Sequence, residues 1–119
     1  FADTGMLAAL HVLAALGEQE GPLSGLVAPY ERYASSGEIN SRVDDVPAAT
    51  ARVRAWGVER GASVDLLDGL SMTSGPDEAY WSVSLRPSNT EPLLRLNVEA
   101  GDEATMSKIR DEVLRMVRA

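Results

Sequence analysis

The chain has 119 residues, of which 45% are hydrophobic and 24% charged, with no cysteine and one histidine. This composition excludes bulk disorder, disulfide bonds and thiolate zinc sites, and it leaves too few imidazoles for a catalytic zinc site. The formal net charge of −7 is opposite to that of most nucleic-acid binders, so a small anion would need a local, preorganised site.

The first predicted element is an apolar helix over residues 6–16, MLAALHVLAAL. Leu, Met and Ala favour a helix, Asp3 or Thr4 can cap its start, and Gly17 can end it. A helix that is apolar nearly all round is typical of a buried helix, yet a chain of this length can hardly bury it on every side. We therefore expect the chain to be a fragment of a larger protein.

No membrane or export signal is visible. The longest apolar stretch, residues 6–16, is too short to span a bilayer, and the start of the chain has no basic region and no cleavage-site pattern. We expect a cytoplasmic protein that binds neither a membrane nor nucleic acid.

A second helix is predicted after Pro22, which suits a first helical turn. Ser35-Ser36-Gly37 then reads as a linker, and the pattern of the chain changes beyond it. The prediction is a boundary there, with a helical segment over residues 1–36 and a separate domain over residues 37–119.

The predicted domain alternates between the period of strands and that of helices. In chain order, the predictions are a strand at 38–43, a helix from Asp44-Asp45 to Gly61, strands at 64–67 and 70–73 around the turn Asp68-Gly69, strands at 80–85 and 94–98, and a helix from residue 102. Strands joined by hairpins need an antiparallel sheet. The predicted class is therefore α+β, a small antiparallel sheet of about four strands with two helices on one face, preceded by two helices.

The segment between the last two predicted strands, Arg86–Pro92, concentrates polar donors in the string RPSNTEP. A guanidinium fork matches two phosphate oxygens, and hydroxyls and turn amides can complete an anion nest. Ser88-x-x-Glu91 also fits a helix capping box, but the alternation that follows Pro92 argues against a helix there. From these residues alone, a phosphate loop and a plain turn both remain open.

The string RPSNTEP followed by LLRLNVEA resembles the phosphate-binding loop in the last domain of the α-D-phosphohexomutases, which include phosphomannomutase and phosphoglucomutase. The resemblance covers most of the chain: residues 1–5 resemble the entry to the last helices of the family's third domain, LSGLVAPYERY the next helix, and Asp68-Gly69-Leu70 the turn before the hairpin. It implies a TATA-box-binding-protein-like last domain at 37–119, after the helical tail of the third domain at 1–36.

The resemblance also implies roles for the loop. Arg86, Ser88, Asn89 and Thr90 would bind the phosphate that is not being transferred, while Glu91 and Pro92 would shape the loop. The family interconverts the 1-phosphate and 6-phosphate of a hexose through a bisphosphorylated sugar, and its last domain moves to close the site, with Ser35–Gly37 as the predicted hinge.

Other parts of the family's equipment are expected upstream of this chain. No serine here has the active-site context, no Asp-x-Asp-x-Asp loop occurs to hold Mg²⁺, and the sugar-reading loop is missing. We therefore expect the full-length enzyme to use Mg²⁺ bound outside this fragment, and the fragment alone to be inactive. The partners implied are a hexose phosphate and the upstream domains.

Two further points bear on function. The string Ser-Asn-Thr around Asn89 resembles the mannose and glucose mutases more than members acting on glucosamine phosphate, which commonly have Gly at that position. The alternative to a mutase domain is a non-enzymatic ligand-sensing or interaction module with a small α+β sheet, in which RPSNTEP is only a turn.

Overall fold

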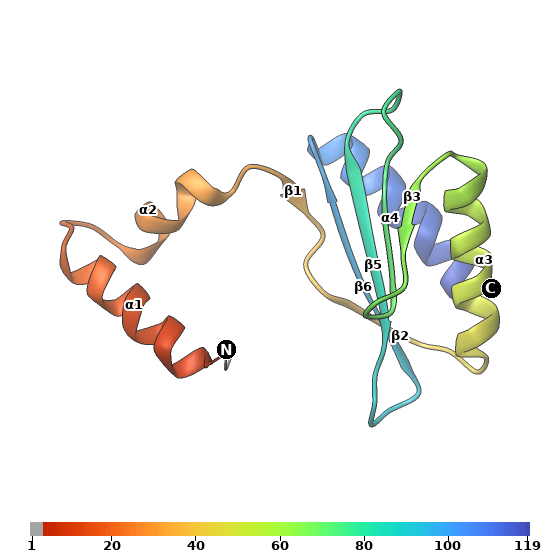
Figure 1. Cartoon of the computed structure of the whole chain (residues 1–119), viewed down its shortest axis with the longest axis horizontal. Helices are drawn as coiled ribbons and strands as arrows, with labels where there is room; N and C mark the ends of the chain where they lie inside the picture. Colours follow the sequence, from red (N-terminus) through yellow and green to blue (C-terminus); the bar gives the residue numbers. More distant parts are fainter. Residues whose placement is uncertain (1–3) are drawn as a thin grey trace. The chain divides into compact units, whose positions relative to one another are not determined.

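The structure, a computed structural model, describes residues 4–119, and the chain divides into two compact units that separate between Arg32 and Tyr33 (Figure 1). The predicted boundary at 36/37 lies four residues later. Ser36 explains the difference, because its N–H donates to the carbonyl of Val98 and its Oγ accepts from the N–H of Val98, both at 2.9 Å. The start of the predicted hinge is thereby bound to the sheet of the second unit.

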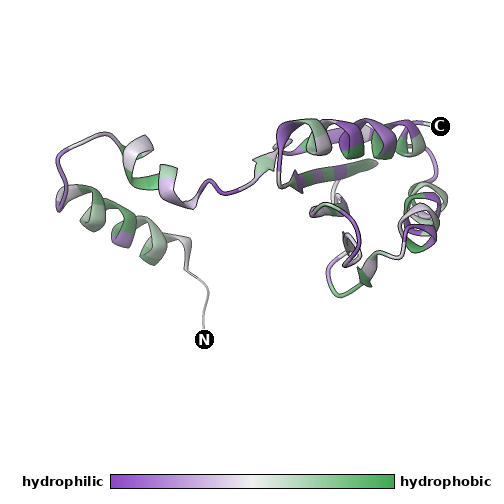
Figure 2. Ribbon diagram, turned by 90° about the horizontal axis from the view of Figure 1, so that it is seen from above, coloured by the Kyte–Doolittle hydropathy of each residue, from purple (hydrophilic) through white to green (hydrophobic). Residues whose placement is uncertain are grey.

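Unit 1 contains α1 (Gly5–Gly17), α2 (Leu23–Val27) and a 3₁₀ turn, η1 (Ala28–Tyr30). The two predicted helices are present. None of their residues is buried, and Figure 2 shows α1 green along most of its length. Thr4 occupies the N-cap position of α1 without a side-chain hydrogen bond, and the alternative cap, Asp3, lies outside the described residues.

Unit 2 contains a six-stranded antiparallel sheet, where a sheet of about four strands was predicted. Its strands are β1 (Ala34–Ser35), β2 (Ile39–Arg42), β3 (Ser63–Asp65), β4 (Leu70–Thr73), β5 (Trp81–Pro87) and β6 (Leu93–Ala100). The order is β1-β6-β5-β4-β3, and β2 also pairs with β6. β2 and β3 correspond to the strands predicted at 38–43 and 64–67, and the strand that was not predicted is the two-residue β1, which pairs with β6.

Two helices, α3 (Val46–Glu59) and α4 (Glu103–Val117), cover one face of this sheet (Figure 2). Each begins at an aspartate whose carboxylate accepts the N–H of the third residue on: Asp45 from Ala48 and Asp102 from Thr105, both at 2.9 Å. Such caps satisfy backbone donors that the first turn of a helix leaves without partners. The predicted α+β class, with two helices on one face of an antiparallel sheet, is confirmed.

The two faces of the sheet differ in chemistry, as the alternation in sequence predicts. Toward the helices, β4, β5 and β6 present the buried side chains Leu70, Met72, Trp81, Val83, Leu85, Leu94, Leu96, Val98 and Ala100. They pack against apolar residues of both helices, including Val53, Met106, Ile109 and Val113.

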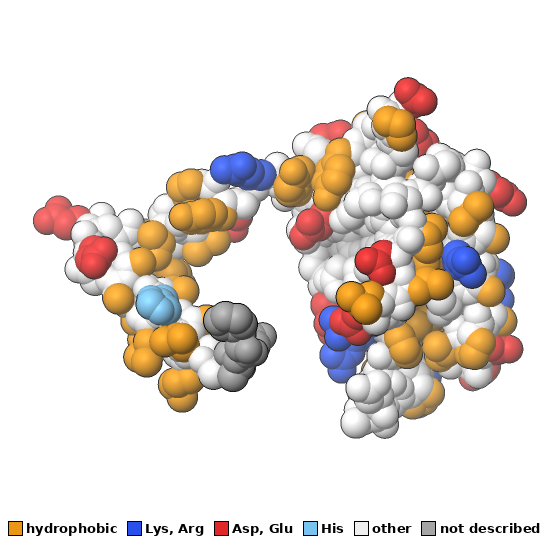
Figure 3. Space-filling model, in the orientation of Figure 1, with side chains coloured by type: hydrophobic (Ala, Val, Ile, Leu, Met, Phe, Trp, Pro, Cys, Tyr) orange, Lys and Arg blue, Asp and Glu red, His pale blue; other side chains and the backbone are white. Residues whose placement is uncertain are grey.

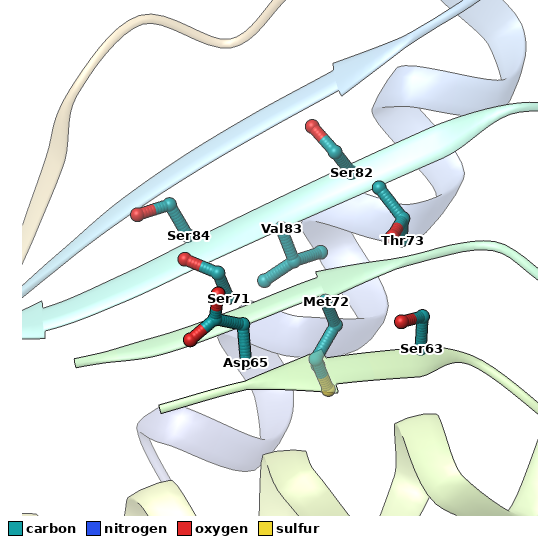
Figure 4. A pocket seen from close by; sticks show the side chains of 8 residues that line it. All are labelled: Ser63, Asp65, Ser71, Met72, Thr73, Ser82, Val83 and Ser84. Carbon is teal, nitrogen blue, oxygen red and sulfur yellow. The ribbon is translucent and has the colours of Figure 1, made fainter. Parts of the chain in front are cut away.

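The opposite face is polar. Cross-strand pairing places Asp65, Ser71, Ser84 and Asn97 in one row, and Ser63, Thr73, Ser82 and Glu99 in the next. Figure 4 shows six of these side chains around a shallow hollow of about 170 Å³, with Met72 and Val83 turned the other way. No helix covers this face within unit 2, so its hydroxyls and carboxylates are open to a partner or to solvent.

Within residues 4–119, no helix has the length and hydropathy needed to cross a bilayer.

Candidate functional site

The segment predicted to carry chemistry lies at the tip of the longest hairpin of the sheet. β5 and β6 pair over seven positions, from Trp81 opposite Ala100 to Pro87 opposite Leu94, and Figure 1 shows the connecting loop projecting beyond the other strands. The N–H of Ser88 donates to the carbonyl of Leu93 at 2.8 Å, which closes the base of the loop. The tip is therefore held by a rigid two-stranded stem.

Two of the four predicted ligands face one another in this loop. The hydroxyls of Ser88 and Thr90 are 3.5 Å apart, and the N–H of Thr90 points to the Ser88 hydroxyl at the same distance. Ser88 is half-buried, whereas Asn89 and Thr90 are exposed. The two hydroxyls and the side-chain amide of Asn89 can rotate toward an anion that enters from solvent.

Arg86 lies two residues before Ser88, near the end of β5 and on the polar face of the sheet. It stands directly opposite Arg95 of β6, and both side chains are exposed. Like charges directly opposite one another on neighbouring strands are unfavourable, so this pair favours an anion nearby. Figure 3 shows basic and acidic side chains together just above the projecting hairpin.

An acidic turn adjoins this arginine pair. Asp68, in the turn between β3 and β4, places Oδ2 3.3 Å from a terminal nitrogen of the Arg86 guanidinium. Gly69 follows with φ of 79°, and a Cβ there would lie 2.7 Å from the carbonyl oxygen of Leu85 and 2.9 Å from Cγ of Arg86. Only glycine therefore allows this turn to lie so close to the end of β5.

A hollow of about 410 Å³ lies beside the same hairpin on the helix side of the sheet. Apart from Thr50 and Arg54, its lining is apolar and includes Val46, Leu66, Leu85 and Pro87. An apolar hollow cannot replace the water around a phosphate, because burying an unpaired charge is costly. A phosphate would therefore bind on the opposite side of the hairpin, where Arg86 and the other polar groups of the candidate site lie.

The four predicted residues come from one continuous segment, but the structure brings them together unevenly. Ser88 and Thr90 are in contact. Among the side-chain interactions of residues 4–119, Arg86 is joined to Asp68, and Asn89 has no bond to the other three. Two charged neighbours, Arg95 and Asp68, were not among the predicted site residues.

The sequence carried a signal for one of these two. Alternation along β5 and β6 puts Arg86 and Arg95 on the outward face, but their position opposite one another depends on the register of the hairpin. The position of Asp68 depends on β4 pairing with β5, and no local pattern gives that neighbour.

Comparison with known proteins identifies the family. Residues 38–116 match the family described as phosphoglucomutase/phosphomannomutase, C-terminal domain. The chain belongs to the phosphoglucomutase/phosphomannomutase family. This match spans β2 through most of α4 and includes the whole β5–β6 hairpin.

Relatives of known name agree with the family. The chain is 40% identical over 120 residues to a protein named "Phosphohexose mutases" from Xanthomonas campestris, which covers 99% of this chain and 26% of that protein. It is 36% identical to a phosphomannomutase from Methanocaldococcus jannaschii, covering 97% of this chain and 24% of that protein. The chain thus spans about a quarter of the length of these mutases.

A solved structure gives the same result in three dimensions. A phosphoglucomutase/phosphomannomutase family protein from Burkholderia thailandensis matches 98% of this chain and 24% of its own, with a TM-score of 0.63 and 26% sequence identity. The α+β architecture described above is therefore that of the C-terminal part of a phosphohexomutase-family protein.

Proposed function

We propose that this chain is the C-terminal part of a phosphohexomutase and that the β5–β6 loop binds the non-transferred phosphate of a hexose phosphate. In this proposal unit 1 is the helical tail of the third domain, and unit 2, from Tyr33 to Ala119, is the phosphate-binding domain, which begins four residues before the predicted boundary. The substrate is mannose or glucose phosphate, interconverted between the 1- and 6-phosphate through a bisphosphorylated sugar.

The observation that carries this proposal is the position of the loop. Arg86 stands opposite Arg95 at its base, Ser88 and Thr90 face one another above, and all four lie at the exposed end of a rigid hairpin. Such a site recognises a phosphate rather than a particular sugar, so it accepts either end of a bisphosphorylated intermediate. Positioning and charge stabilisation dominate phosphoryl transfer, so a loop that forms no covalent bond still contributes to rate.

Each side chain has a distinct part in this proposal. Arg86 offers its planar fork to two phosphate oxygens, Ser88 and Thr90 donate hydroxyl hydrogens to the others, and Asn89 donates its amide. Arg95 adds positive potential from the neighbouring strand. Among residues 4–119, no group of three or more His, Asp or Glu side chains is placed to hold a metal ion. In this proposal, the Mg²⁺ that the resemblance implies is bound by the upstream part of the full-length enzyme.

The chain itself offers the first test. Backbone amide shifts of the labelled protein are followed during titration with inorganic phosphate and with mannose 1-phosphate. The proposal expects both ligands to move the amides of residues 86–90, weakly, because the rest of the substrate site lies elsewhere. Shifts confined to other residues, or none at high millimolar ligand, contradict a phosphate site in this loop.

A second test uses the full-length enzyme that contains this chain. Arg86→Ala removes a charged hydrogen bond to the phosphate and is expected to lower kcat/KM by about tenfold or more. Arg54→Ala is the matched control, since it removes an exposed arginine from α3 and is expected to leave kcat/KM unchanged. If kcat/KM of Arg86→Ala equals that of Arg54→Ala, Arg86 does not bind the phosphate as proposed.

A further inference from the structure

The ion pair between Asp68 and Arg86 places an anion of the protein beside the proposed phosphate ligand. The carboxylate comes from the β3–β4 turn and the guanidinium from the end of β5, so the pair joins two separate loops at one end of the sheet. Of the carboxylates in the described chain, Asp68 alone lies within 4.0 Å of the Arg86 guanidinium.

The pair is close, fixed from one side and easily opened. Gly69 allows the turn to lie close to the carbonyl of Leu85, and the next residue, Leu70, pairs with Leu85 in the sheet, so Asp68 stays near Arg86. The side chains are nevertheless 55% and 73% exposed, and they meet through one terminal nitrogen at 3.3 Å rather than through a two-point fork. Exposed single-point ion pairs contribute little stability, whereas a phosphate can engage the fork at two points.

We infer that Asp68 is a built-in competitor for Arg86: it pairs with the guanidinium while the loop is empty and is displaced when a phosphate binds. This inference rests on the proposed function. Its consequence is a phosphate site tuned for release, because each binding event must break the internal pair and bring a dianion close to a carboxylate. A mutase that binds either phosphate of one intermediate in succession needs a site that lets go quickly.

The expected effect of removing the competitor is tighter binding. Asp68→Asn keeps the shape of the side chain and a turn-favouring Asn-Gly sequence, so the hairpin should form as before. Loss of the negative charge is expected to lower the Kd for inorganic phosphate about threefold at low ionic strength, and less at high salt because the charges are screened. If Asp68 instead positioned Arg86 for binding, the same substitution would weaken binding.

The test is an amide-shift titration of the 119-residue chain with inorganic phosphate at about pH 8, where the dianion predominates. Two controls accompany Asp68→Asn. Asp77→Asn removes the same charge from the loop between β4 and β5, at the other end of the sheet, and should leave the Kd unchanged. Asp68→Glu keeps the charge and should retain the weaker, wild-type binding.

A second readout follows the carboxylate itself. On saturation with phosphate, the ¹³C carboxyl resonance of Asp68 should move toward that of a solvated aspartate, while that of Asp77 stays in place. Tighter binding by Asp68→Asn together with this movement supports displacement.

The outcomes separate the two proposals. If wild-type protein binds phosphate at residues 86–90 but Asp68→Asn binds equally or more weakly, or if the Asp68 resonance does not move, the competitor role is wrong and the phosphate site stands. If Asp77→Asn tightens binding as much as Asp68→Asn, the effect is one of net charge and the competitor role is again wrong. If neither wild type nor Asp68→Asn responds at residues 86–90, both proposals are wrong.

Discussion

α1 in unit 1 and β5 with β6 in unit 2 are all rich in large apolar side chains, but their burial is opposite. Met6, Leu10 and Leu13 of α1 are 75%, 56% and 62% exposed, whereas Val83 and Leu96 of the sheet are 2% and 1% exposed. The strands concentrate their apolar residues on one face, which two helices can cover, while α1 is apolar nearly all round and unit 1 has too few elements to cover it. The difference teaches that an apolar segment becomes a core only when its own unit supplies the facing surface.

The largest expected effect tests this difference in burial by making the same Leu→Ala substitution in each unit. Leu96→Ala should reduce the free energy of unfolding of unit 2 by about 2–5 kcal/mol, because it leaves a cavity against the helices. Leu10→Ala, in the exposed helix, should change it by less than about 0.5 kcal/mol. Urea unfolding followed by tryptophan fluorescence measures this effect, since Trp56 and Trp81 both belong to unit 2. A loss above about 1 kcal/mol for Leu10→Ala would mean that α1 contributes to the folding of unit 2.

A comparison of two glycines tests whether the rigid packing of unit 2 extends to the candidate site. Gly69 and Gly61 both have positive φ, 79° and 73°, but a Cβ at Gly69 meets the Leu85 carbonyl and the Arg86 side chain, while one at Gly61 meets nothing within 4 Å. Gly61→Ala should therefore cost about 1–2 kcal/mol from backbone strain alone. Gly69→Ala should cost about 1–3 kcal/mol more from the clash.

Chemical denaturation of the two glycine variants gives these values, and amide spectra show where the structure changes. The extra cost of Gly69→Ala should appear as shifts at residues 85–88, next to the candidate site. Equal costs for the two alanines would indicate that the β3–β4 turn is free to move away from β5, and the fixed position inferred for Asp68 would then be lost.

The sequence predicts unit 2 better than its edges or its loop contacts. Strict alternation along β5 and β6 and helical spacing along α4 each place the apolar side chains on one face of the element, and Trp81, Leu96 and Ile109 on those faces are buried. The two-residue β1 carries too few residues for a period, and its place beside β6 depends on hydrogen bonds far apart in the chain. The ion pair of Asp68 with Arg86 could not be predicted for the same reason, because its formation depends on the register of β4 on β5.

For the candidate site, the local string RPSNTEP was enough to select the segment, but not to arrange it. The contact between Ser88 and Thr90 is local and follows from the turn. The facing of Arg86 and Arg95 depends on hairpin register, which the proline-flanked loop does not reveal by itself. Composition gave no guide to local charge, since a chain of net charge −7 places two arginines side by side at this loop.

The smallest expected effect concerns the starts of the helices, where the units also differ. In unit 2, the N–H of Thr105 and then its hydroxyl donate to the Asp102 carboxylate, and these bonds hold the pKa of Asp102 below its ordinary value. In unit 1, Thr4 makes no side-chain cap to α1. The start of α4 should therefore respond to acid, and the start of α1 should not.

The sign follows from linkage. Because the folded pKa of Asp102 is depressed, its contribution to stability is fully present above the ordinary carboxyl range, near pH 4, and is lost as pH falls through the folded pKa. Asp102→Ala should thus be less stable than wild type at pH 6, with the difference shrinking as the pH is lowered below about 4. Asp111, whose pKa is also lowered by its hydrogen bond from Arg110, titrates in both proteins and cancels in the comparison.

Thermal unfolding at a series of pH values measures this difference, with two controls. Asp102→Asn keeps a capping oxygen that does not titrate, so its stability relative to Asp102→Ala should hold at low pH, where the advantage of the wild-type aspartate fades. Thr4→Ala should leave helix content unchanged at every pH, because no side-chain bond is lost. A pH-independent gap between wild type and Asp102→Ala would show that the cap acts through hydrogen-bond geometry alone and that its charge contributes nothing to the start of α4.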